Sequence, residues 1–103
     1  MRQHRSKEDI VADILSIIKG NSKKTHIMYR ANLSYALLSK YLSKLISAGL
    51  IKYRESDGGF ELTEKGLTYL EKYAEYERMR SQLEANKSEL GKKEASLAEI
   101  LEA

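Results

Sequence analysis

The order of elements is decided by residues 25–62, which read THIMYRANLSYALLSKYLSKLISAGLIKYRESDGGFEL. Apolar residues recur at helical spacing over residues 35–48, and Ser34 stands before them as a residue that caps helices. Gly49 follows them, where a glycine commonly ends a helix. The Asp-Gly pair at 57–58 is a turn signal between two β-prone segments. The stretch therefore predicts a short helix, a tight turn, a second helix and a β-hairpin.

Helical patterns flank this stretch on both sides. Apolar residues over 10–18 fall on one face at helical spacing, and Ser6 is placed to cap their first turn. We expect the Gly-Asn pair at 20–21 to end this helix in the left-handed conformation. A last helix is predicted to start at residues 63–64 and to run to the end of the chain, interrupted weakly by Gly91.

The helix predicted over residues 35–48 has two chemically different sides. One side is an apolar stripe that we expect to face the core, made of Leu38, Tyr41, Leu42, Leu45 and Ile46. The other side carries serine and lysine, which donate hydrogen bonds to phosphates and reach base edges in a major groove. Free amides at the start of the helix favour an anion, and two cations flank the hairpin tip. The predicted DNA-contacting residues are Ser34, Tyr35, Ser39, Lys40, Ser43, Lys44, Lys52 and Arg54.

The charge distribution agrees with this assignment. The 18 basic residues exceed the 15 acidic ones, giving a net charge of +3, and the excess lies before the last helix. A polyanionic partner is therefore expected at the front of the chain. We expect the helix over 35–48 to enter the major groove of double-stranded DNA, with the hairpin and the N-terminal cations Arg2, Arg5 and Lys7 on the phosphate backbone.

The last helix contains a repeat with alternating steps of three and four residues, which is the spacing of a coiled-coil seam. The repeat positions are Tyr76, Met79, Leu83, Asn86, Leu90, Lys93, Leu97 and Ile100. Burying each leucine is worth about 1.5–3 kcal/mol, whereas a single helix in water is marginal. We therefore predict a homodimer with an interface of Tyr76, Met79, Leu83, Asn86, Leu90, Leu97 and Ile100. The orientation of the pair is left open, and the alternative is a frayed tail after about Leu83.

Together these patterns predict a mainly α fold with a minor α+β component. The order of elements is that of a winged helix-turn-helix with a two-stranded wing and a long C-terminal dimerisation helix. At 103 residues the chain is long enough for one small domain and not for two. We expect residues 1–63 to form the winged helix-turn-helix DNA-binding domain and residues 64–103 to form a long helix in a dimeric coiled coil.

The same region resembles the winged-helix motif of small archaeal DNA-binding proteins. The resemblance rests on MYRANLSY at 28–35, Tyr-Leu at 41–42, Leu45, Gly-Leu-Ile at 49–51 and LTEKG at 62–66. The long last helix is similar to that of the archaeal ten-kilodalton chromatin-associated proteins, which dimerise through an antiparallel coiled coil. The resemblance implies a homodimeric DNA-binding protein that acts as a transcriptional regulator or as a chromatin-associated architectural protein, with antiparallel pairing.

Composition excludes several other kinds of site. The chain has no cysteine, which excludes a disulfide framework, a thiolate metal site and a cysteine nucleophile. His4 and His26 have no helical partner, and no glycine-rich phosphate loop is present. We therefore expect no enzymatic activity, no metal, no cofactor and no small-molecule ligand. No apolar run approaches the roughly 18 residues of a membrane span, so we expect no membrane partner, no signal peptide and a cytoplasmic, nucleoid-associated location.

The main alternative is a protein–protein docking module, because winged helices also serve as docking domains. In that case the coiled coil is the functional part of the chain. The residue pattern does not distinguish binding to a specific operator sequence from binding to any DNA duplex, nor a regulatory role from an architectural one.

Overall fold

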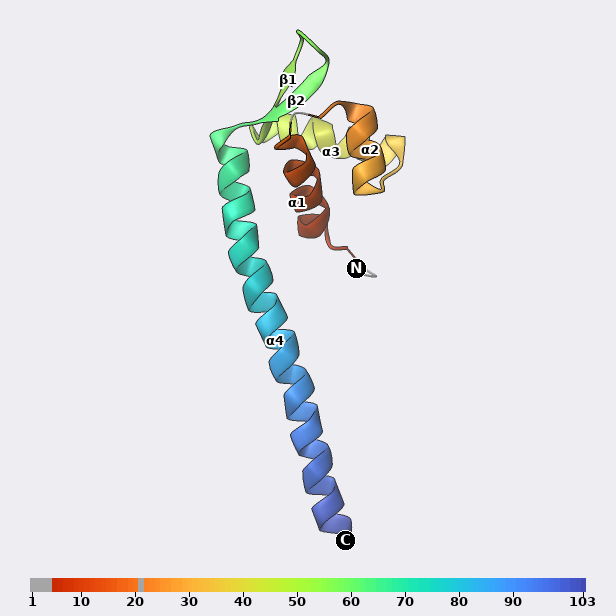
Figure 1. The fold of residues 1–103 in the computed structure, drawn as a ribbon, viewed down its shortest axis with the longest axis vertical. Helices are drawn as coiled ribbons and strands as arrows, with labels where there is room; N and C mark the ends of the chain where they lie inside the picture. The colour runs from red at the N-terminus through yellow and green to blue at the C-terminus, as the bar shows by residue number, and fades with distance from the viewer. Residues whose placement is uncertain (1–4, 21) are drawn as a thin grey trace. The chain divides into compact units, whose positions relative to one another are not determined.

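The computed structural model describes residues 5–20 and 22–103, so the predicted roles of Arg2 and Asn21 lie outside the described residues. Its elements are α1 (Lys7–Ile18), α2 (Lys24–Ala31), α3 (Tyr35–Ser47), β1 (Ile51–Arg54), β2 (Gly59–Leu62) and α4 (Glu64–Glu102) (Figure 1). The predicted order of helices and strands is confirmed. The chain divides after Tyr73 into two compact units, which are described separately below.

Local side-chain chemistry sets the ends of the helices in the first unit. The Ser6 hydroxyl accepts a hydrogen bond from the Asp9 amide at 3.1 Å, and the Asp9 carboxylate accepts one from the Ser6 amide at 3.0 Å. Ser34 caps α3 as predicted, and Gly49 ends it with φ +80°. The first helix ends just before Gly20, as predicted, but the left-handed conformation expected of Gly20 is wrong. Helix α1 ends in a right-handed residue, Lys19, whose amide bonds to the carbonyls of the preceding turn.

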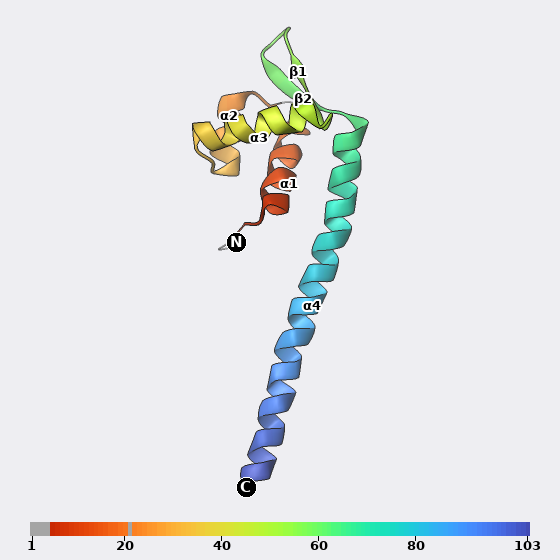
Figure 2. The same cartoon turned by 180° about the vertical axis from the view of Figure 1, so that it is seen from behind.

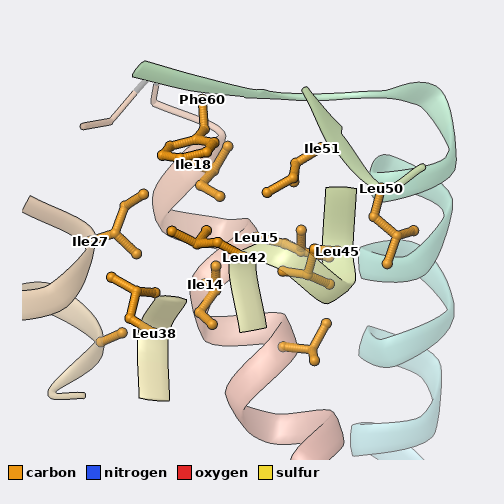
Figure 3. Close-up of a cluster of buried hydrophobic side chains, with 12 residues drawn as sticks. Ile14, Leu15, Ile18, Ile27, Leu38, Leu42, Leu45, Leu50, Ile51 and Phe60 are labelled. Atoms are coloured by element: carbon orange, nitrogen blue, oxygen red, sulfur yellow. The ribbon is translucent and has the colours of Figure 1, made fainter. Parts of the chain in front are cut away.

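Helices α1, α2 and α3 enclose the hydrophobic core of the first unit together with the two-stranded ribbon (Figure 3). The core leucines of α3 are Leu38, Leu42 and Leu45, and they pack with apolar residues of α1 and α2 and with Ile51 and Phe60 of the ribbon. Ile46, which was predicted to belong to the same stripe, is 43% exposed. Ile46 is one position after the core residue Leu45. One step along a helix rotates the side chain by about 100° around the helix axis, which brings Ile46 to the outer edge of the apolar stripe.

The two strands form a hairpin that projects from the three helices in both views (Figure 1, Figure 2). Strand β1 pairs antiparallel with β2, with Ile51 opposite Leu62 and Tyr53 opposite Phe60. The rings of Tyr53 and Phe60 meet edge to face, with their centroids 5.4 Å apart. The Gly58 amide closes the turn by donating to the Arg54 carbonyl at 2.9 Å, so the predicted wing is present.

The LTEKG segment at 62–66 joins the ribbon to α4 and to the end of α3. The Thr63 hydroxyl accepts from the Gly66 amide at 3.1 Å and donates to the Gly49 carbonyl at 2.6 Å. The Lys65 ammonium donates to the Ala48 carbonyl at 2.6 Å, which satisfies an acceptor that the last turn of α3 leaves free. The segment therefore fixes where α4 begins.

Gly66 is required at this junction because α4 passes close to the backbone before β1. A Cβ added at Gly66 would lie 2.3 Å from the Leu50 carbonyl oxygen and 3.1 Å from Cδ2 of Leu62. That oxygen also accepts from the Thr63 amide at 3.1 Å, so it does not move aside without weakening this bond.

We expect Gly66→Ala to lower the free energy of unfolding by about 2 kcal/mol, as overpacking of a close contact does. Urea denaturation followed by circular dichroism measures the change. Gly91→Ala is the matched control, because a Cβ at Gly91 meets nothing within 4 Å. The control is expected to gain up to about 1 kcal/mol from better helix propensity. Equal stability of Gly66→Ala and the parent chain would show that the junction adjusts freely.

Two tyrosines of α4 attach its first turns to α1 within the first unit. The Tyr69 hydroxyl donates to the Glu8 carbonyl at 3.2 Å, and the Tyr73 hydroxyl donates to the Asp9 carboxylate. Asp9 is only 1% exposed, so hydrogen bonds from the Tyr73 hydroxyl and the Ser6 amide, rather than water, solvate its charge.

The second unit consists of the rest of α4, which stays helical to Glu102. Its large apolar side chains are exposed, and they include every apolar residue of the predicted seam. The Arg80 guanidinium lies over the Tyr76 ring, 5.3 Å from its centroid. Leu83 and Leu90 are 67% and 65% exposed. Among the described helices, none combines the length and the apolar character that crossing a membrane requires.

Candidate nucleic-acid interface

The side of α3 that faces away from the core is exposed and carries no acidic residue. Lys40, Ser43, Lys44 and Ser47 all lie on it, as the helical spacing predicted. Because the core leucines hold the opposite side, these side chains are free of any packing role. This exposed side offers ammonium and hydroxyl donors over about two turns of helix.

Ser39 does not belong to this exposed side. Its hydroxyl oxygen is buried and has no hydrogen-bond partner among the described residues. Ser39 follows Leu38, a core residue, and lies on the border between the buried and exposed sides of α3. The interpretation of Ser39 as part of a continuous outward stripe is therefore corrected, because periodicity does not resolve border positions.

Three lysines from two helices meet beside α3. Lys7, the first residue of α1, lines a hollow of about 220 Å³ together with Leu37, Lys40, Tyr41 and Lys44. Lys7, Lys40 and Lys44 are called the lysine cluster below. No carboxylate lines this hollow, so its polar lining is cationic apart from the tyrosine hydroxyl.

The proximity of these lysines changes the chemistry of one of them. A side-chain hydrogen bond with Lys7 and the charge of Lys7 hold the pKa of Lys44 below its usual value, with smaller contributions from burial and from the charge of Lys40. The ammonium groups of the cluster repel one another in the unbound protein, and this repulsion disfavours the protonated form of Lys44.

The start of α3 combines an aromatic ring with a further cation. Tyr35 is 65% exposed, and the Lys24 ammonium lies 3.9 Å from the centroid of its ring. The Ser34 hydroxyl accepts from the Leu37 amide at 3.1 Å and keeps its own proton for another acceptor. Both predicted residues are therefore accessible, and Lys24 joins them from α2.

Arg5 has a structural role that differs from the predicted contact with DNA. Its guanidinium donates to the Asp13 carboxylate at 3.1 Å, to the Ala31 carbonyl at 2.7 Å and to the Asn32 carbonyl at 3.2 Å. It thus joins the segment before α1 to the last turn of α2, where free carbonyls need donors. Arg5 is therefore engaged in these hydrogen bonds and is not the free cation that the sequence alone indicated.

The two cations of the hairpin differ in their availability. Arg54 donates through Nε and Nη2 to both oxygens of Asp57, at 3.2 and 2.9 Å, in a bidentate pair. The hydrogen bond from the Gly59 amide holds the pKa of Asp57 below its usual value, against an opposing effect of burial, and the hydrogen bond and charge of Arg54 lower it further. Lys52 is exposed, and its ammonium lies 3.9 Å from a Glu61 oxygen. Lys52 is therefore the freer cation of the hairpin.

The family model for winged helix-turn-helix proteins matches residues 4–81. The chain belongs to this family. Two uncharacterized proteins of Methanocaldococcus jannaschii are 48% identical over 66 residues and 40% identical over 76 residues. The alignments cover 63% and 73% of this chain, and the chain spans 66% and 35% of the length of those relatives.

Solved winged helices give the same result for the fold. The crystal structure of Sso10a-2, a DNA-binding protein from Sulfolobus solfataricus, matches with a TM-score of 0.79 and 26% identity over 85% of this chain and 95% of that one. ZitR of Lactococcus lactis, solved in complex with DNA, matches with a TM-score of 0.57 and 21% identity over 80% of this chain and 62% of that one. The predicted winged-helix fold and the resemblance to small archaeal DNA-binding proteins are confirmed.

Reasoning from the sequence of this winged helix missed two features of the surface. It did not bring Lys7 together with α3, because that contact depends on how α1 packs. It also overlooked Lys24, although the Lys-Lys pair at 23–24 at the start of α2 was a visible signal. In the part of the chain that the structure describes, no group of three or more His, Cys, Asp or Glu residues is arranged to hold a metal.

Proposed function

We propose that this chain is a homodimeric DNA-binding protein that inserts α3 into the major groove of double-stranded DNA. The observation that carries the proposal is the exposed, acid-free side of α3, with Lys40, Ser43 and Lys44 pointing away from the core of a winged helix-turn-helix. A major groove about 12 Å wide admits a helix of this kind. The similarity to Sso10a-2, itself a DNA-binding protein, supports the proposal.

In this arrangement the hairpin and the start of α3 contact the backbone. Lys52 is exposed on β1 and is suited to a phosphate beside the groove. The DNA contacts of Ser34, Tyr35 and Ser43 are part of the proposal. Arg54 would have to exchange its Asp57 partner for a phosphate, so we assign it a smaller contribution than Lys52.

The chemistry of α3 favours sequence-tolerant binding. Strong base discrimination usually comes from bidentate side chains such as arginine on guanine and asparagine or glutamine on adenine. The α3 sequence, YALLSKYLSKLIS, contains none of these residues. Its lysines and serines reach base edges as well as phosphates, and their phosphate contacts do not depend on the base sequence. This supports a chromatin-associated architectural role over a regulator of one operator.

The second unit is proposed to pair with a second copy of the chain through its exposed seam. Tyr76, Met79, Leu83, Leu90, Leu97 and Ile100 would be covered in such a coiled coil, with Asn86 fixing the register. Lys93 also occupies the seam and favours antiparallel pairing. A parallel pair in register would place the two Lys93 ammonium groups opposite each other, whereas antiparallel pairing separates them.

The dependence of binding on salt tests the proposed function. We expect the affinity for duplex DNA to fall by about a hundredfold or more when salt rises from about 50 to about 200 mM, because several phosphate contacts release counterions. Fluorescence anisotropy with labelled duplexes of unrelated sequence measures this. The affinities at one salt concentration are expected to agree within about tenfold between sequences.

The rival function gives a different result in the same assay. A docking module for another protein would show no duplex binding at low salt, or an affinity that salt leaves unchanged. Either result would refute DNA binding. A preference of several orders of magnitude for one sequence would instead support a regulator and refute the sequence-tolerant reading. The proposed function is binding and not catalysis, in keeping with the family.

A further inference from the structure

We infer that the lysine cluster forms a discrete site for a single phosphate group of the DNA backbone, held between the start of α1 and the middle of α3. This inference rests on the proposed function and deepens it, because it assigns a phosphate contact to Lys40 and Lys44 of α3 and adds Lys7 of α1 to the interface. The ligand chemistry is a tetrahedral oxyanion, and its proposed source is a phosphodiester of the duplex.

The geometry of the hollow fits such a group. Lys40 and Lys44 are four residues apart and so lie one above the other on α3, and Lys7 approaches from α1. The hollow of about 220 Å³ has room for a phosphate and a few waters, since one water takes about 30 Å³. Leu37 and Tyr41 supply its remaining lining, so that three ammonium donors converge on one small volume.

The charges of the cluster are not balanced by the residues around it. None of its three lysines takes part in an ion pair within the described ranges. One carboxylate lies nearby, since Glu8 shares a neighbouring hollow with Lys7, Lys44 and Tyr69. The immediate charge is therefore three ammonium groups against one carboxylate, and a bound phosphate would reduce the repulsion among the lysines.

The N-terminal end of α1 does not form the phosphate site by its backbone amides alone. Ser6 and Asp9 use amides of the first turn in a capping box, and Glu8 and Asp9 already offset the positive end of the helix. The side chains of the cluster are the donors. Lysine side chains reach phosphates as mobile point charges, which suits an open hollow of this kind.

Binding at this site has a thermodynamic signature. The hydrogen bond and charge of Lys7 lower the pKa of Lys44 in the free protein, and a phosphate placed against Lys44 would raise that pKa again. Over the pH range between the lowered and the restored pKa, DNA binding takes up a proton. Affinity is therefore expected to fall as pH rises through that range, and to be independent of pH below it.

The decisive variant is Lys7→Ala, because Lys7 lies outside α3 and its loss leaves the groove-facing side intact. We expect the affinity for duplex DNA to fall about tenfold and the salt slope to decrease by about one, as loss of one phosphate contact predicts. Lys19→Ala is the matched control. It removes the same charge from the other end of α1 and is expected to change the affinity less than about twofold.

The pH dependence provides a second and independent readout. The affinity of the parent chain is expected to fall as pH rises through the range between the lowered and the restored pKa of Lys44, and this fall is expected to be shallower in Lys44→Arg, because arginine stays charged. Circular dichroism checks that each variant is folded. Equal pH profiles of the parent chain and Lys44→Arg would refute the proton uptake that the site requires.

The outcomes separate this inference from the proposed function. If Lys7→Ala binds with the affinity and salt slope of the parent chain, the phosphate site is wrong while DNA binding stands. If the parent chain binds no duplex, the proposed function itself fails. Titration with inorganic phosphate, followed by NMR of the lysine side chains, tests the other source. Saturation of the cluster by free phosphate that leaves duplex binding unchanged would overturn the assignment to a backbone phosphate.

Discussion

The double substitution Lys40→Glu with Lys44→Glu is expected to weaken duplex binding by about a thousandfold or more while the winged helix stays folded. The change replaces two ammonium groups with two carboxylates on the side of α3 that would face the groove. It removes attraction and adds repulsion from the phosphates, so its effect exceeds the loss of two contacts. Fluorescence anisotropy at low salt gives the affinity, and circular dichroism gives the fold.

The fold is expected to survive because both side chains are exposed and the core leucines lie on the other side of α3. Lys19→Glu with Lys72→Glu is the matched control, since both residues are exposed in the first unit and the change in net charge is the same. The control is expected to weaken binding by less than about tenfold. An unchanged affinity of the Lys40 and Lys44 variant would remove α3 from the interface.

Much of the fold was predictable because local chemistry marks the ends of its elements. Ser34 caps α3 and Gly49 ends it, and the Asp-Gly pair at 57–58 makes the hairpin turn. The sequence-based predictions fail where tertiary packing, rather than local sequence, determines the structure. Ile46 has the right spacing for the core, yet the contacts of α3 stop at Leu45. Gly20 is a permissive residue, yet its own backbone does not adopt the left-handed conformation.

The candidate site was predictable to the same extent. Helical spacing alone places Lys40 and Lys44 on the exposed side of α3, because this placement requires only knowledge of which side faces the core. The contact of Lys7 with Lys44 joins residues far apart in the chain, and the sequence contains nothing that sets how α1 lies against α3. Arg5 shows the same limit, since its carbonyl partners at the end of α2 are provided only by the tertiary fold.

The double substitution Leu83→Asp with Leu90→Asp is expected to convert the protein into monomers. Both leucines occupy the seam and are 67% and 65% exposed in the single chain, so their apolar surface gains most from a partner helix. Each leucine buried in the dimer is worth about 1.5–3 kcal/mol, and each aspartate would bring an unpaired charge into the seam. We expect the dissociation constant of the dimer to rise at least about a thousandfold.

Analytical ultracentrifugation measures the change in assembly, and circular dichroism is expected to show a loss of helix, because an unpaired helix is marginal in water. Ser88→Asp with Ala95→Asp is the matched control. These two exposed residues lie on the side of the helix away from the seam, so the control is expected to remain a dimer. DNA affinity should fall with dimer loss as well, because a monomer brings only one winged helix to the duplex.

The same experiment distinguishes the seam from its alternatives. A dimer that persists in Leu83→Asp with Leu90→Asp would place the partner surface elsewhere on the chain. A parent chain that is already monomeric would mean that the exposed leucines have no partner helix of their own kind. The second result would also remove the link between pairing and DNA affinity, while the charge reversal on α3 would still test the winged helix alone.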